Sequence, residues 1–399
     1  MYQEKLKVLH IIASVDMSEG GPIQAIVQQL EILPDDQTLE IVCLDDPNAD
    51  YVKNFHGTVH ALGPTTKNYR YTPKLKSWII EHAHRYDAAV IHGLWNHASI
   101  GGWQGCKQSQ LPYVVFTHGM LDPWFKKTYP LKHLKKQIFW LLQGQVLKDA
   151  ASVLFTCQEE QNLAQGVFWG YRYTSQVVAF GAPDVPHFQQ DVKAAFYKLI
   201  PELADTPYLL FLSRIHEKKG CDLLIQAFAK LEKRPNLKLV IAGPCHDDLI
   251  DQLKQLAVDL KIDQRIYWPG MLRGEEKAGA FSAAEAFVLI SHQENFGIAV
   301  AEALAYGKPV LISNQINIWR EIEQGGAGIV SEDSVAGATS VLQQWEDLTP
   351  TERQEMALAA RATYLKNFTV QAAAEDLTRA LFNAIHQKKK KNERLISSV

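Results

Sequence analysis

Two glutamates that flank a short apolar stretch are the most informative chemical feature of this sequence. Glu294 follows an apolar run of strand length at 286–290, and Glu302 lies eight residues further on, within helix-forming residues. Ligands of open α/β sheets bind at the carboxyl ends of strands, where a helix N-terminus offers free amides to an anion. Two carboxylates beside such amides suit a ligand with an anionic centre and hydroxylated ends, such as a nucleotide-diphosphate sugar. The alternative is that Glu294 caps the helix and Glu302 faces solvent.

Two cations on one loop supply a second piece of chemistry. Arg214 and Lys219 follow the apolar run at 208–213 and precede a helix that we expect to begin near Asp222. A guanidinium and an ammonium on that loop can neutralise a diphosphate and stabilise it as a leaving group. A solvated basic loop is the alternative interpretation of this spacing.

Histidines stand at the ends of two strand-length runs in the first half of the chain. His118 follows the run at 113–117 directly, and His92 ends the preceding run. A lone histidine is more often structural, but one at the carboxyl end of a strand, beside a glycine, is well placed for a site. Trp95 and Asn96 come shortly after His92. We expect these three residues to shape an acceptor pocket, which is a pocket for the second substrate of a group transfer.

The elements that must position these residues form a repeating pattern. Apolar runs of strand length alternate with helix-length segments, which indicates parallel sheets built from βαβ units. We expect strands at 8–13, 39–44, 88–92, 113–117, 152–156 and 176–180 in the first half, and at 208–213, 237–242, 265–268, 286–290, 309–312 and 327–330 in the second. The sequence therefore predicts an α/β fold with two doubly wound domains that face a central cleft.

Composition and charge narrow the class of protein. The net charge of −3 gives no global attraction to nucleic acid, so nucleic acid is not an expected partner. Five scattered cysteines without a C-x-x-C pair argue against a disulfide framework and a structural zinc site, and favour the cytosol. The chain shows no secretory signal pattern, and no run approaches the ~18 apolar residues of a membrane span. We expect a cytoplasmic protein, with peripheral attachment at the inner membrane face as an alternative.

The motifs together resemble those of a known family. The E-x7-E pair and the R-x4-K-G pattern of Arg214, Lys219 and Gly220 are similar to the signatures of retaining glycosyltransferases of family 4, of the bacterial polysaccharide type, which have the GT-B fold. The resemblance implies that the two cations hold the donor diphosphate, that Glu294 holds a sugar hydroxyl and that Glu302 holds the ribose. It implies the catalytic set His118, Glu294, Arg214 and Lys219. The further donor-binding residues that it implies are Gly20, Gly21, Gly243, Met271, Leu272, Asn295, Phe296 and Gly297.

The resemblance also implies the mechanism and the partners. A hexosyl group would move with retention from a UDP- or GDP-sugar to a glycan or lipid-linked acceptor, in exopolysaccharide or cell-surface polysaccharide biosynthesis. No cofactor is expected, and the absence of a D-x-D pair makes a metal unnecessary. The alternatives are a nucleotide-sugar hydrolase or epimerase of the same fold, and a non-catalytic module that binds nucleotide sugars.

Chain length and local composition give the domain limits, and the resemblance implies that the last helix returns to the first domain. Residues 1–185 would form an acceptor-binding Rossmann-like domain and 208–366 a nucleotide-sugar-binding one. Residues 186–207, which are rich in proline and polar groups, would form the interdomain linker. Residues 367–399 would contain a C-terminal helix that crosses back to the first domain, followed by a basic tail.

One basic and aromatic segment could contact a membrane. Residues 123–140 interleave aromatic residues with five lysines. Such a segment suits an interfacial position on anionic lipid. A partly buried helix with a solvated lysine face is the alternative.

Overall fold

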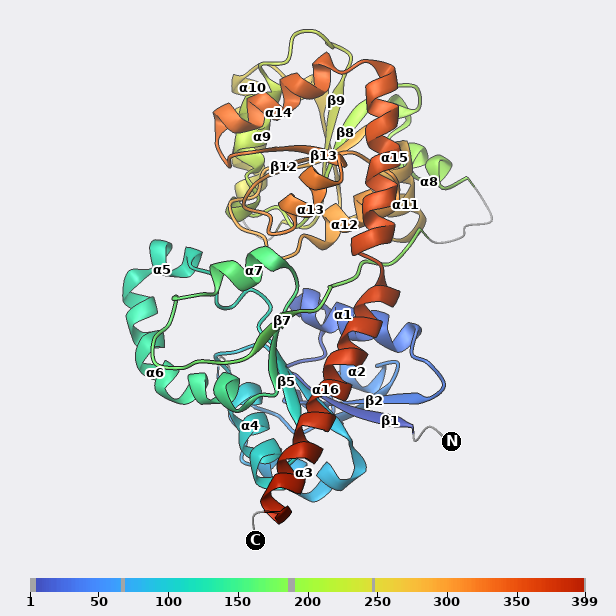
Figure 1. Cartoon of the computed structure of the whole chain (residues 1–399). Coiled ribbons are helices and arrows are strands. Elements are labelled where there is room, and N and C mark those ends of the chain that lie inside the picture. Colours follow the sequence, from blue (N-terminus) through green and yellow to red (C-terminus); the bar gives the residue numbers. More distant parts are fainter. Residues whose placement is uncertain (1–4, 66–68, 186–190, 246–247, 398–399) are drawn as a thin grey trace. The chain divides into compact units, whose positions relative to one another are not determined.

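The chain folds into two compact units, each built around a parallel sheet (Figure 1). The computed structural model describes residues 5–65, 69–185, 191–245 and 248–397. The first unit, here called the first domain, comprises residues 1–180 and 370–399, and the second domain comprises 181–369. The predicted α/β fold with two doubly wound domains is confirmed, and the central cleft between them stays a prediction.

The first domain contains a seven-stranded sheet in the order β3-β2-β1-β4-β5-β6-β7, in which all neighbours run parallel. Its strands are β1 (Leu6–Ile11), β2 (Gln37–Cys43), β3 (Thr58–Ala61), β4 (Ala88–His92), β5 (Tyr113–Phe116), β6 (Ser152–Phe155) and β7 (Ser175–Val177). The direction in which strands are added reverses between β1 and β4. The loops after these strands therefore diverge there and leave room for a ligand.

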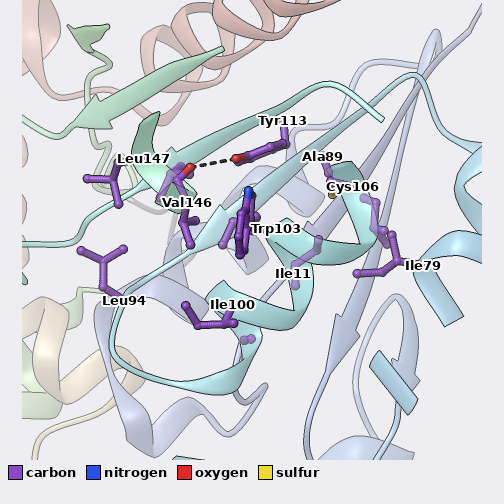
Figure 2. Packing of buried hydrophobic residues seen from close by; sticks show 14 of the residues in the cluster. Ile11, Ile79, Ala89, Leu94, Ile100, Trp103, Cys106, Tyr113, Val146 and Leu147 are labelled. Carbon is purple, nitrogen blue, oxygen red and sulfur yellow. Dashed lines mark hydrogen bonds between the residues drawn. The ribbon is translucent and has the colours of Figure 1, made fainter. Parts of the chain in front are cut away.

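Helices cover both faces of this sheet. They are α1 (Gly21–Glu31), α2 (Asp50–Lys53), α3 (Lys74–His82), α4 (His97–Ser109), α5 (Trp124–Thr128), α6 (Pro130–Asp149), α7 (Gln158–Leu163) and α16 (Val370–Ser397). Successive residues of a strand point to opposite faces, so Ile11 joins the core formed with α3, α4 and α6, whereas Val8 packs with Leu377 and Leu381 of α16. In the first of these cores, Tyr113 Oη donates to the carbonyl of Val146 at 2.8 Å (Figure 2).

The second domain contains a six-stranded parallel sheet in the order β10-β9-β8-β11-β12-β13. Its strands are β8 (Tyr208–Leu212), β9 (Lys238–Ala242), β10 (Ile266–Gly270), β11 (Ala286–Leu289), β12 (Val310–Ser313) and β13 (Gly328–Ser331). Its helices are α8 (Val192–Leu199), α9 (Cys221–Phe228), α10 (Leu249–Asp259), α11 (Gly274–Ala283), α12 (Ile298–Ala305), α13 (Trp319–Gln324), α14 (Val335–Asp347) and α15 (Pro350–Asn367). Its central strands are apolar on both sides because helices bury both faces.

Three elements differ from the prediction. Strand β3 was not predicted from the sequence, because this edge strand is partly exposed and lacks an uninterrupted apolar run. The segment 186–207, predicted as a linker, contains helix α8. Phe196 of this helix is fully buried, and Gly279 of α11 packs closely against α8. Residues 186–190 lie outside the described part of the chain. Helix α16 continues through the basic run that was predicted as a tail.

Candidate active site

In the second domain, Lys219 and Glu294 come together at the carboxyl ends of two neighbouring strands. Lys219 ends a 3₁₀ turn after β8, and its ammonium donates to the carboxylate of Glu294 in the loop after β11. Only 14% of the Lys219 side chain and 23% of the Glu294 side chain are exposed. The two charges are thus held together in a partly desolvated place, although 75 residues separate them in the chain.

The backbone around this pair is tightly packed. Gly220 adopts a φ of +62°, and a Cβ there would lie 1.9 Å from the carbonyl oxygen of Ile290. The carbonyl of Lys218 accepts hydrogen bonds from the amide of His292 and from Ser291 Oγ, both at 2.8 Å. These contacts fix the turn after β8 against the end of β11, so the position of Lys219 is set by backbone packing.

The helix that follows Glu294 begins without a side-chain cap. Gly297 is the N-cap of α12 and has a φ of +76°, a conformation that favours glycine. The Glu294 carboxylate bonds to Lys219 and does not cap the helix, which removes the capping alternative. Phe296 is buried and anchors the loop, and the adjacent residue Asn295 is partly buried.

Glu302 also pairs with a lysine. In the second half of α12, its carboxylate accepts a hydrogen bond at 2.7 Å from Lys277 of α11, and only 14% of the glutamate side chain is exposed. Burial, followed by the nearby Glu302 carboxylate, raises the pKa of Tyr306 to about 12. Glu302 therefore does not simply face solvent. Sequence reasoning missed Lys277, because its role arises from the packing of two helices and no motif marks it.

The other predicted donor residues of this domain follow the ends of β8, β9 and β10. Arg214 is exposed and, among the described residues, has no ion-pair partner. Gly243 has a φ of +143°, and a Cβ there would lie 1.8 Å from the carbonyl oxygen of Ser213, so only glycine lets the two loops approach. Met271 is 52% exposed, whereas Leu272 is buried in the core.

In the first domain, the loop that carries His118 is held by a buried carboxylate. Glu160 of α7 accepts hydrogen bonds from Thr117 Oγ1 at 2.8 Å and from the amide of Gly119 at 2.6 Å, and also from the amide and the hydroxyl of Thr156. His118 has a φ of +49°, so the chain turns sharply between its two anchored neighbours. Sequence reasoning missed Glu160, whose four bonds join the ends of β5 and β6.

The side chains of His10, His92 and His118 form a row in space, and His118 stands at one end of it. His10 Nδ1 lies 2.9 Å from His92 Nε2, and His92 Nδ1 lies 3.0 Å from His118 Nε2. Burial lowers the pKa of His10 to about 3, and burial together with its two neighbours lowers that of His92 well below its ordinary value. Both ring nitrogens of His92 are engaged in these contacts, and its predicted role at the acceptor stays a prediction. His10 carried no signal in the sequence.

Trp95 and Asn96 also have structural partners. Asn96 caps α4 by accepting a hydrogen bond from the amide of Ala98 at 3.0 Å. Trp95 donates through Nε1 to the carbonyl of Met120 at 3.2 Å, and the ammonium of Lys136 lies 4.7 Å from the centre of a Trp95 ring. These contacts fix both side chains in the first domain, and their predicted role as acceptor ligands stays a prediction.

The loop after β1 that contains Gly20 and Gly21 has open space beside Gly20. Gly20 has a φ of +100°, a Cβ there would meet no atom within 4 Å, and α1 begins at Gly21. The adjoining chain is held by buried Asp45, which accepts from the amide of Val15 at 2.7 Å and from Arg70 at 3.1 Å. The loop thus combines an accessible backbone with a fixed position.

Two family models match the chain, one in each half. The model described as Glycosyl transferase 4-like domain matches residues 20–179, and Glycosyl transferases group 1 matches residues 198–363. An uncharacterized glycosyltransferase of Methanocaldococcus jannaschii is 33% identical over 158 residues, which cover 38% of this chain and 40% of that protein. The D-inositol 3-phosphate glycosyltransferase of Saccharomonospora viridis is 30% identical over 195 residues, with 45% and 43% covered. The chain thus spans less than half the length of these curated relatives.

Solved structures resemble the chain over almost its full length. The HepE protein of Anabaena, in complex with UDP and glucose, has a TM-score of 0.74 at 18% identity, with 94% of this chain and 99% of that one covered. A glycosyltransferase from Rickettsia africae has a TM-score of 0.76 at 17% identity, with 96% and 99% covered. At these identities the likeness shows a shared fold.

Proposed function

This chain belongs to the group 1 glycosyltransferases with the GT-B fold, and we propose that it moves a hexosyl group, with retention, from a UDP- or GDP-sugar to a hydroxyl of a glycan or lipid-linked acceptor. The observation that carries this proposal is the partly desolvated pair of Lys219 and Glu294 beside the N-terminus of α12, which has no side-chain cap. The process we propose for it is the assembly of exopolysaccharide or cell-surface polysaccharide in the cytoplasm.

The second domain would bind the donor. Arg214 and Lys219 would neutralise the diphosphate as the bond to the sugar breaks, and the first amides of α12 would bind its oxygens. Glu294, which Lys219 holds in place, would accept a hydrogen bond from a hydroxyl of the sugar. One oxygen of Glu302 is held by Lys277, which leaves the other to accept from the ribose.

The first domain would complete the reacting centre. The open backbone at Gly20 and Gly21 would donate to a phosphate oxygen, and His118 would contact the donor sugar. The acceptor hydroxyl would attack the anomeric carbon on the face that the diphosphate leaves, and a phosphate oxygen would take its proton. Such a reaction depends on positioning and on stabilisation of the leaving group, and it needs no side-chain nucleophile and no metal.

Thermal-shift screening of UDP- and GDP-sugars tests the donor, and UDP-glucose is the first choice because the fold relative HepE was solved with it. The best binder is then incubated with and without glycan and lipid-linked acceptors. Transfer that depends on an acceptor is the expected result. Release of free sugar at the same rate without acceptor would identify a hydrolase, and binding without turnover would identify a non-catalytic module.

Helix α6 supports a further part of the proposal, contact with an anionic membrane surface. The side chains of Leu131, Leu134, Ile138 and Leu141 are 61% to 78% exposed and recur at helical spacing on the side opposite buried Trp140. The segment 123–148 contains six lysines and no acidic residue, although the whole chain has a net charge of −3. Leucine and isoleucine side chains would enter the headgroup region while the lysines contact lipid phosphates.

The aromatic residues of this helix face the other way. Trp140 is buried and Phe139 is partly buried, so the apolar contact would come from the aliphatic stripe and not from the aromatics that first suggested it. Among the described residues, no helix is long and apolar enough to cross a bilayer.

Vesicle co-sedimentation tests the membrane contact. The chain should bind vesicles that contain phosphatidylglycerol more strongly than pure phosphatidylcholine vesicles, and Leu134→Gln with Ile138→Gln should abolish the difference. Leu358→Gln, at a residue of α15 that is 65% exposed, is the matched control and should bind as the unaltered protein does. Binding that is independent of anionic lipid, or equal in all variants, would refute this contact.

A further inference from the structure

The ring nitrogens of His10, His92 and His118 form a continuous hydrogen-bonded row across three adjacent strands. His10 is in β1, His92 ends β4 and His118 follows β5, and the rings lie nearly parallel, with centroids 5.1 Å and 5.3 Å apart. His10 and His92 are buried, whereas His118, as a whole residue, is only partly buried. The row thus connects the interior of the first domain to the loop of the candidate site.

All three rings are neutral near pH 7. Burial lowers the pKa of all three, and each of its neighbours, if charged, would lower that of His92 further. A neutral imidazole carries one N–H donor and one acceptor nitrogen. The row therefore contains three protons on six ring nitrogens.

Counting these protons leaves two arrangements. Each of the two hydrogen bonds needs one proton, and His92, which takes part in both bonds, has a single proton to give. If His92 carries it on Nδ1, then His10 and His118 must also be protonated on Nδ1. If His92 carries it on Nε2, then the other two must be protonated on Nε2. Any mixture breaks a buried hydrogen bond or creates a buried charge, and both are costly.

We infer that His10 and His92 are positioning residues that set the tautomer of His118, so that its Nδ1 changes between donor and acceptor only when all three rings change together. In the first arrangement Nδ1 of His118 donates, as contact with a phosphate or a carbonyl oxygen requires. In the second arrangement it accepts, as contact with a sugar hydroxyl proton requires. The coupling does not depend on the proposed transferase activity, but its use in binding the donor sugar does.

The coupling can be measured on the ligand-free chain. With isotope-labelled imidazole nitrogens, long-range proton–nitrogen NMR spectra report which nitrogen of each histidine carries the proton. We expect the fraction protonated on Nδ1 to be the same for His10, His92 and His118. His97 serves as the internal reference, because its Nε2 lies 2.7 Å from the carbonyl of Thr72 and must donate. Unequal fractions at His92 and His118 would overturn the inference, and this comparison requires no variant.

A variant tests the far end of the row. His10→Asn should change the shared fraction at His92 and His118 by the same amount, although residue 10 does not touch His118. His60→Asn, at a histidine of β3 that bonds to Glu40 outside the row, is the matched control and should leave both fractions unchanged. A His10→Asn protein that folds with both fractions unaltered would contradict the inference.

Addition of UDP-glucose separates this inference from the proposed function. If the three fractions are equal and shift together on addition, both hold. If they are equal and do not respond to the nucleotide sugar, the row is coupled but His118 does not contact the donor.

Discussion

At the scale of single residues, each glutamate of the candidate donor site is matched by a lysine. Lys219 holds Glu294, and Lys277 holds Glu302, so both carboxylates are fixed in place. An ionised carboxylate can only accept hydrogen bonds, which suits sugar and ribose hydroxyls. The pairing therefore converts two partly buried acids into preorganised acceptors.

Glu302→Gln tests this role for the ribose contact. The amide has one acceptor oxygen in place of two, and it loses the charge that binds Lys277. Hydrogen bonds to charged groups are worth about 1.5–3 kcal/mol, so calorimetry should show roughly 10- to 100-fold weaker binding of UDP or GDP. Glu276→Gln, at an exposed residue of α11, should bind the nucleotide normally. Equal affinity in both variants would exclude Glu302 from the nucleotide site.

At the scale of elements, glycines at strand ends let neighbouring loops approach. Gly220→Ala places a methyl group 1.9 Å from a carbonyl oxygen of the β11 loop, whereas at Gly326, with nearly the same φ of +61°, a Cβ would meet nothing within 4 Å. Left-handed backbone costs an alanine roughly 1–2 kcal/mol at either position. We expect Gly326→Ala to lose about that much stability in urea unfolding and to keep its activity.

Gly220→Ala should lose clearly more stability than Gly326→Ala, and it should lower turnover, because relief of the clash moves the turn that carries Lys219. If the two variants behave alike, close packing of this turn does not position the lysine.

The sequence predicted the buried strands correctly but missed contacts between residues that are far apart in the chain. Buried strands such as β8 and β11 are continuous apolar runs, and their ends correctly located Arg214, Lys219 and Glu294. The half-exposed edge strand β3 has no such pattern. Lys277, Glu160 and His10 were missed because their partners are 25, 41 to 43 and 82 residues away, and local sequence does not encode such contacts.

At the scale of the whole molecule, each domain has its own core, and the end of the chain belongs to the first of them. Leu381 of α16 is 2% exposed and packs on β4 and β5.

Leu381→Ala should destabilise the first domain by about 2–4 kcal/mol. Hydrogen exchange should speed up in β4 and β5 and stay unchanged in β8 and β11. Phe382→Ala, at the neighbouring and more exposed residue, should have little effect, and equal exchange in both variants would contradict this packing.

The central claim is that two cations after β8 stabilise a departing nucleoside diphosphate, and release of UDP or GDP from a nucleotide sugar measures it most directly. Arg214→Ala and Lys219→Ala should each lower turnover roughly 100-fold or more while the protein stays folded. Lys233→Ala, at an exposed lysine that pairs with Asp347 in the same domain, should release the nucleotide at the original rate. If Arg214→Ala and Lys219→Ala also keep the original rate, these residues do not bind the diphosphate and the proposed site is wrong.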